Sequence, residues 1–144
     1  MALELYMLGL IVQDMGKALE FYRRLGLVIP DGSEQKTHVE VKMGSGLTFF
    51  LDSRPARWDP QFVQRDDLGR VEASDSYRAI LEFHLKTRDA VDAKYNELTG
   101  FGYQSHRAPY ETSFRMYFAM IRDPDGNIIL LSGDLEETQT SQAG

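Results

Sequence analysis

The chain has 144 residues, 42% of them hydrophobic, which is enough for one well-buried domain. A formal net charge of −6 argues against a nucleic-acid partner, since binding to phosphates needs clustered Lys and Arg. The absence of cysteine excludes disulfides, thiolate metal sites and cysteine nucleophiles. The apolar runs have only strand length and the N-terminus lacks a signal-peptide pattern, so we expect a cytoplasmic protein with no membrane segment.

The first predicted elements are a strand with alternating apolar residues and a helix with an apolar stripe. The strand residues are Leu8, Leu10 and Val12, and the helix residues are Ala18, Tyr22 and Leu25. Residues 81–99 repeat this pattern. The repeat consists of Leu81, Phe83 and Leu85, followed by Val91, Tyr95 and Leu98.

The second half of each copy also matches, and each copy is predicted to be a strand, a helix and three strands. The matching residues are Val39, Val41, Phe49, Phe50 and Leu51 in the first copy, and Ala119, Ile121, Ile129, Leu130 and Leu131 in the second. We therefore predict an α+β fold of two βαβββ modules, residues 1–52 and 79–133, forming a curved mixed sheet. Its helices cover the outer side, and its concave side is a ligand cup.

Residues 53–78 separate the two modules and carry Pro55, Pro60, Gly69 and the only tryptophan, Trp58. They show no sustained period, so we interpret them as a linker with one possible helical turn. Residues 134–144 contain almost no apolar side chain and are predicted to be a disordered tail.

A tight acidic turn joins the last two predicted strands. Its sequence runs from Arg122 through Asp123, Pro124, Asp125 and Gly126 to Asn127. Pro and Gly two positions apart, flanked by Asp and Asn, are typical of a hairpin reversal. The Asp side chains are therefore predicted to serve the turn itself.

These motifs resemble the vicinal oxygen chelate superfamily, which includes glyoxalase I, extradiol dioxygenases, fosfomycin-resistance enzymes and the bleomycin-resistance proteins. The resemblance covers about residues 4–133 and is carried by residues 12–27 and by the turn at 123–127. It implies paired βαβββ modules, frequent homodimers and ligands bound in the cup of the sheet.

Metal-using members of that family carry ligands on the first and last strands of each module. The corresponding positions here are Met7, Ile80, Leu130 and Phe50, with Thr48 as an alternative to Phe50. Apolar side chains offer no donor to a transition metal. We therefore expect no metal and no cofactor, and the resemblance then points to the metal-free, bleomycin-resistance-like branch.

Strand alternation predicts which side chains line the cup, and Trp58 is added as a linker aromatic that could close over a ligand. The predicted ligand-binding residues are Met7, Ile11, His38, Glu40, Phe50, Trp58, Ile80, Glu82, His84, Phe118, Met120 and Leu130. Such a surface suits an aromatic or cationic small molecule. The alternatives without a ligand are that the apolar residues of this set form ordinary core, that Glu82 and His84 form an inert pair, and that Trp58 packs within the linker.

The leading functional hypothesis is a homodimeric protein that binds an antibiotic-like small molecule and performs no chemistry. A second hypothesis is a metal-free lyase or isomerase in which Glu82 or His84 is the general base. A third is a dioxygenase-type enzyme with a relocated metal site that uses His84 and Glu82, with His38 or Glu40 opposite. His106 lies in a polar stretch and is interpreted as a surface residue.

Overall fold

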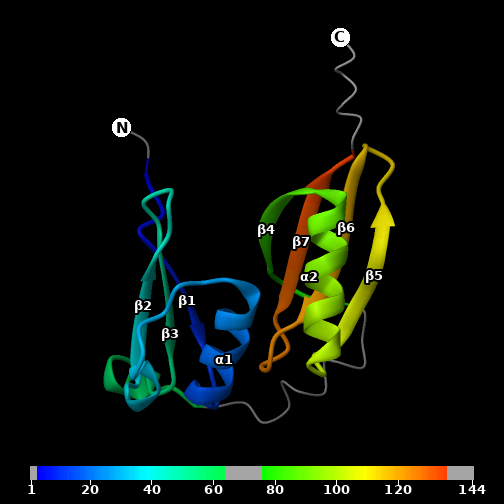
Figure 1. The fold of residues 1–144 in the computed structure, drawn as a ribbon. Helices are drawn as coiled ribbons and strands as arrows, with labels where there is room; N and C mark the ends of the chain where they lie inside the picture. Colours follow the sequence, from blue (N-terminus) through cyan, green and yellow to red (C-terminus); the bar gives the residue numbers. More distant parts are fainter. Residues whose placement is uncertain (1–2, 64–75, 136–144) are drawn as a thin grey trace. The chain divides into compact units, whose positions relative to one another are not determined.

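A computed structural model describes residues 3–63 and 76–135 of the chain. The chain divides into two compact units, Met1–Asp66 and Asp67–Gly144, and each is described here by itself (Figure 1). The predicted tail after residue 135 and the linker stretch 64–75 lie outside the described residues. Neither described helix combines the length and the hydropathy needed to cross a membrane.

Unit 1 consists of a three-stranded mixed sheet and one long helix. Its elements are β1 (Met7–Ile11), α1 (Met15–Leu25), the 3₁₀ turn η1 (Ser33–Gln35), β2 (His38–Lys42), β3 (Thr48–Asp52) and the 3₁₀ turn η2 (Pro55–Arg57). The strand order is β1-β3-β2, with β1 parallel to β3 and β2 antiparallel to it. The single 3₁₀ turn η2 lies where one helical turn was expected in the linker.

Helix α1 starts and stops where its sequence dictates. The Asp14 carboxylate accepts a hydrogen bond from the Lys17 amide at 3.0 Å, which satisfies one of the free amides of the first turn. Gly26 ends the helix with a φ of 132°, a conformation that favours glycine. The buried stripe of α1 packs on the sheet, and the Tyr22 ring meets the Phe49 ring of β3 edge-on at 5.4 Å.

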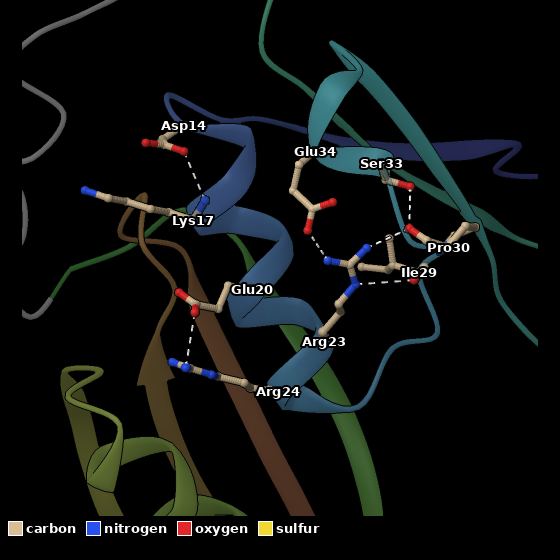
Figure 2. Close-up of polar contacts among 9 residues, drawn as sticks. All are labelled: Asp14, Lys17, Glu20, Arg23, Arg24, Ile29, Pro30, Ser33 and Glu34. Atoms are coloured by element: carbon tan, nitrogen blue, oxygen red, sulfur yellow. Dashed lines mark hydrogen bonds and ion pairs between the residues drawn. The ribbon is translucent and has the colours of Figure 1, made fainter.

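The prediction of three strands after the first helix is wrong for unit 1, where the described residues form only two. The segment between α1 and β2 is instead a loop containing η1. Arg23 fixes this loop: its guanidinium donates to the carbonyls of Ile29, at 3.3 Å, and Pro30, at 2.6 Å, and pairs with Glu34 (Figure 2). The bonds from Arg23 satisfy the two carbonyls without a partner strand, and Pro30 has no amide N–H to donate to a strand ladder.

Unit 2 contains the complete βαβββ module. Its elements are β4 (Ile80–Thr87), α2 (Arg88–Gly100), β5 (Ser105–Glu111), β6 (Met116–Arg122) and β7 (Ile128–Asp134). They form one mixed sheet of order β4-β7-β6-β5, in which β4 and β7 are parallel (Figure 1). Strand β7 extends to Asp134, one residue beyond the predicted end of the module.

Side chains of β6 and β7 identify the face of the unit 2 sheet that α2 covers. The Tyr117 hydroxyl donates to Asp92 of α2 at 2.7 Å, and a Cβ built on Gly133 would lie 3.1 Å from Val91 of α2. Ala119, Ile121, Ile129 and Leu131 share this face by alternation and are fully buried. We call the opposite face of each sheet its far face.

The predicted turn is confirmed in detail. Asp123 is buried and accepts hydrogen bonds from the amides of Asp125 and Asn127, both at 2.9 Å, and from the Asn127 side chain at 3.0 Å. Gly126 has a φ of 89°, which the turn requires. The Asp123 carboxylate therefore serves the turn, as expected.

Strand registers confirm the internal repeat. In unit 1 Phe50 of β3 lies opposite Gly9 of β1, and in unit 2 Leu130 of β7 lies opposite Glu82 of β4. The same alignment makes Asp52 equivalent to Ser132. Both residues carry a hydrogen bond to an imidazole, and these bonds define the polar parts of the two far faces.

Candidate functional site

A histidine and an aspartate face each other across strands β2 and β3 of unit 1. His38 and Asp52 are register partners, and His38 Nδ1 lies 2.8 Å from Asp52 Oδ2. Glu40, two residues along β2, has its Oε2 atom 3.0 Å from His38 Nε2. Because carboxylates only accept hydrogen bonds, these two contacts place a proton on each ring nitrogen and favour the imidazolium form.

Asp52 is held rigidly in this arrangement. Its side chain is 1% exposed, and its Oδ1 atom accepts from the Arg54 amide at 2.7 Å. Its Oδ2 atom also accepts from the Trp58 indole Nε1, at 3.3 Å. Three donors on one buried carboxylate fix its position and, through it, the orientation of the His38 ring.

The other members of the site are more exposed. The Glu40 side chain is 41% exposed and Trp58 is 57% exposed, so both can meet a ligand from solvent. The Phe50 ring lies 4.9 Å from the His38 ring at an angle of 34°. Four predicted ligand-binding residues are therefore connected: His38 and Trp58 bond to Asp52, and Glu40 and Phe50 contact His38.

The hydrogen bonds shift the pKa values of His38 and Asp52 in the directions that favour the charged form of each group. The bond to Asp52, followed by the bond to Glu40, raises the pKa of His38 above its ordinary value. Burial by itself raises the pKa of Asp52, but the hydrogen bonds from His38, the Arg54 amide and Trp58 outweigh burial and hold this pKa below its ordinary value.

These shifts predict how stability depends on pH. Stabilisation from His38 is complete below its unfolded pKa, near about 6.5, and is lost as pH rises through its raised folded pKa. Stabilisation from Asp52 is complete above its unfolded pKa, near about 3.9, and is lost as pH falls through its lowered folded pKa. Urea midpoints should therefore decline on both sides of the window from about pH 4 to pH 6.5.

The variant His38→Gln should remove the alkaline decline in the urea midpoint, whereas His84→Gln should keep it. A wild-type midpoint that does not fall as pH rises above about 6.5 would contradict the ion-pair reading of His38.

Phe50 fills part of the far face of unit 1. A Cβ added to Gly9 would lie 2.0 Å from the tip of the Phe50 ring, so this ring rests directly on the β1 backbone. Phe50 is thus both a packing residue and an aromatic surface beside His38, and Gly9 leaves the space that its ring occupies. Glycine opposite an aromatic residue on a neighbouring strand is the signal that identifies such a pair.

The far face of unit 2 is largely apolar. Met120, Ile128 and Leu130 form a buried cluster, and the half-buried Phe118 packs against it. Tyr110 and Phe114 meet the Phe118 ring edge-on, at centroid distances of 6.1 Å and 5.8 Å. The structure thus brings together the predicted residues Phe118, Met120 and Leu130, and burial gives them a core role whatever else they do.

Glu82 and His84 are exposed on β4. His84 Nδ1 lies 3.0 Å from the Ser132 hydroxyl, and its Nε2 atom lies 3.6 Å from Asp134. Strand β4 is an edge strand of the unit 2 sheet, and this part of its far face reaches solvent.

The family's four metal-ligand positions hold residues that do not fit a metal. Met7, Ile80 and Leu130 lack a nitrogen, carboxylate or thiolate donor, and Phe50 lies on Gly9. Thr48, the alternative, is 4% exposed on β3. Across residues 3–63 and 76–135, no three His, Asp or Glu side chains gather as a metal-ligand set.

The remaining predicted site residues, Met7, Ile11 and Ile80, lie on the edge strands β1 and β4. Alternation and register place them on the far faces. The sequence predicted that His106 is a surface residue, but its side chain is half-buried on β5. Its Nδ1 atom lies 3.2 Å from the Arg122 guanidinium, and its ring meets Tyr77 edge-on.

A shallow hollow of about 530 Å³ lies elsewhere in unit 1, along the solvent side of α1. Four of the charged residues around it form ion pairs, Arg24 with Glu20 and Arg23 with Glu34 (Figure 2). The sequence did not single out this surface. The surroundings of Asp52 combine a buried hydrogen-bond acceptor with aromatic residues, and the lining of the hollow contains neither. We therefore take the surroundings of Asp52 as the candidate site.

Comparison with known proteins decides the family. Residues 5–131 match the model of the Glyoxalase/Bleomycin resistance protein/Dioxygenase superfamily. The chain belongs to this superfamily. No curated protein matches the sequence significantly.

Solved structures support the same fold. The chain is 20% identical to a glyoxalase/bleomycin resistance protein/dioxygenase family enzyme from Burkholderia phytofirmans PsJN, with 92% of this chain and 100% of that chain covered and a TM-score of 0.71. It is 21% identical to hypothetical protein SA1046 from S. aureus, with coverages of 92% and 94% and a TM-score of 0.68. A glyoxalase/dioxygenase from Nostoc punctiforme is 19% identical, with coverages of 91% and 90% and a TM-score of 0.65. At these identities the likeness shows the fold alone.

Proposed function

We propose that this superfamily member is a metal-independent protein that binds an aromatic, cationic small molecule of the antibiotic-like kind. The observation that carries the proposal is the cluster in which His38 and Trp58 bond to the buried Asp52 while Glu40 and Phe50 contact His38. The exposed indole of Trp58 offers a stacking surface, and the exposed Glu40 offers a carboxylate. A cytoplasmic location and a homodimer remain predictions.

The charge of the site favours a cation over an anion. With His38 protonated, the three ionisable groups Asp52, His38 and Glu40 sum to one negative charge. A quaternary ammonium group attached to an aromatic ring would complement both the residual charge and the indole face. The apolar cluster of Met120, Ile128 and Leu130 in unit 2 is the weaker candidate for the ligand site, because its members are buried.

Fluorescence tests this proposal, because Trp58 is the only tryptophan. We expect phenacyltrimethylammonium, a cationic aryl ketone, to quench Trp58 emission and to raise the melting temperature. Its neutral tert-butyl isostere, in which carbon replaces the ammonium nitrogen, should bind more weakly. The variant Glu40→Gln should weaken the cation by about 1 kcal/mol because it removes the exposed carboxylate.

The matched control is Glu20→Gln, which removes an exposed carboxylate from the α1 hollow and should leave the affinity unchanged. The proposal fails if a panel of cationic and neutral aromatic compounds gives neither quenching nor thermal stabilisation.

A further inference from the structure

We propose that His38, oriented by Asp52, transfers protons to and from a carbon acid bound at this site, so that the protein catalyses enolisation of an aryl carbonyl compound. The inference rests on the ligand site proposed above, because the carbonyl compound has to lie beside Trp58 and Glu40. It assigns a catalytic role to a histidine on β2, away from the family's four metal-ligand positions on the first and last strands of each module.

Asp52 fixes the orientation of the His38 ring. A general base needs a fixed ring direction, and a second group usually supplies it. Here His38 Nδ1 bonds to Asp52, which itself accepts from the Arg54 amide and the Trp58 indole. The side chain of Asp52 is 1% exposed, so water does not compete for these bonds.

Glu40 controls the access of a ligand to His38 Nε2. His38 Nε2 bonds to Glu40, whose side chain is 41% exposed and can rotate away. Rotation of Glu40 would free Nε2 for a ligand while Nδ1 stays bonded to Asp52. The Phe50 ring lies beside the imidazole, and the Trp58 indole bonds to the same Asp52 oxygen as His38, so an aryl group has apolar surface on which to lie.

The charged groups around His38 favour its protonated form. Asp52 of β3 and Glu40 of β2 both contact the imidazole, and each stabilises its protonated form. Strand β1 places Met7, Gly9 and Ile11 on the far face and adds no charged group. From η2, the Arg57 guanidinium donates to Thr37 at 2.5 Å rather than to the imidazole or its carboxylates.

The reaction balances without a co-reactant. Neutral His38 keeps its proton on Nδ1, and its Nε2 lone pair takes a proton from the carbon next to the carbonyl. The C–H electron pair forms a carbon–carbon double bond, and the carbonyl π pair moves to oxygen to give an enolate. The imidazolium exchanges its Nε2 proton with solvent and then donates a solvent-derived proton to the carbon, so that the compound is regenerated with an exchanged hydrogen.

Hydrogen exchange in D₂O measures this step directly. Proton NMR of phenacyltrimethylammonium should show its α-protons replaced by deuterium about 10²-fold faster with wild-type protein than with His38→Gln. The rate should rise with pH through the pKa of His38, because only the neutral imidazole is a base. The imidazole control His106→Gln, in unit 2, should exchange at the wild-type rate.

A second variant keeps the inference testable if His38→Gln fails to fold. Asp52→Asn nearly preserves shape but removes the charge that stabilises the imidazolium, so the pH midpoint of exchange should move to lower pH and the maximal rate should fall. A purely structural Asp52 would leave the midpoint unchanged, and that result would overturn the inference. Quenching of Trp58 with equal exchange in wild type and His38→Gln would also overturn it while leaving the binding function intact. Absence of binding would reject both.

Discussion

Replacing Gly133 by alanine is expected to cost unit 2 about 3 kcal/mol of unfolding free energy. A Cβ at this position would lie 2.6 Å from the Thr87 carbonyl oxygen and 2.8 Å from its carbonyl carbon. These atoms belong to the backbone at the start of α2, where the Thr87 side chain accepts from the Ala90 amide at 3.1 Å. Because no rotamer change can relieve a backbone clash, α2 and β7 would have to separate.

Urea denaturation measures this loss, and Gly44→Ala is the matched control. A Cβ at Gly44 meets no atom within 4 Å, and its φ does not lie in the left-handed region. The control should therefore change stability by less than about 1 kcal/mol. Equal stabilities of the two variants would contradict the close packing of β7 under Thr87.

Replacing Asp52 by alanine should destabilise unit 1 by about 3 kcal/mol. The change leaves the Arg54 amide and the Trp58 indole without their acceptor and removes the buried partner of His38. It also removes an anchor at the end of β3, next to the backbone bond from the Val12 amide to the Asp52 carbonyl. Trp58 emission should shift as the indole loses its hydrogen bond.

The control is Asp31→Ala, an exposed loop carboxylate, which should change stability by less than about 0.5 kcal/mol. Asp52→Asn should fall between the two, because the amide oxygen can still accept from a backbone donor. An Asp52→Ala variant as stable as the Asp31→Ala control would show that the three hydrogen bonds around Asp52 contribute nothing to folding.

Periodicity predicted the faces of the strands because burial enforces it. Val39 and Val41 are buried, whereas His38 and Glu40 face away from α1, as two-residue alternation requires. The turn around Asp123 was predictable for a similar reason, since its Pro, Gly and Asn residues act locally. Local signals of this kind do not depend on how distant segments meet.

Asp52 was missed because its role depends on register. Read alone, an aspartate at the end of an apolar strand before a polar linker looks like an ordinary boundary residue. Only the pairing of His38 with Asp52 across β2 and β3, and the return of η2 toward this strand end, reveals the shared carboxylate. The missing third strand of unit 1 depends on a side-chain contact that strand periodicity does not reveal, the Arg23 guanidinium on carbonyls six and seven residues further along the chain.

Equivalent positions in the two units show how the repeat has diverged. Asp52 and Ser132 occupy matching places on β3 and β7, but the imidazole comes from β2 in unit 1 and from β4 in unit 2. Among the residues that the structure describes, only unit 1 joins an imidazole to a buried carboxylate that also accepts from an indole. This difference is the reason for placing the candidate site in unit 1.

A two-dimensional NMR titration with phenacyltrimethylammonium tests the central claim, that the ligand binds around Asp52. We predict shift changes at the Trp58 indole N–H and at the amides of His38 and Glu40. Shift changes confined to the α1 hollow, at Lys17, Glu20 and Arg24, would contradict the account and place the site on the solvent side of that helix.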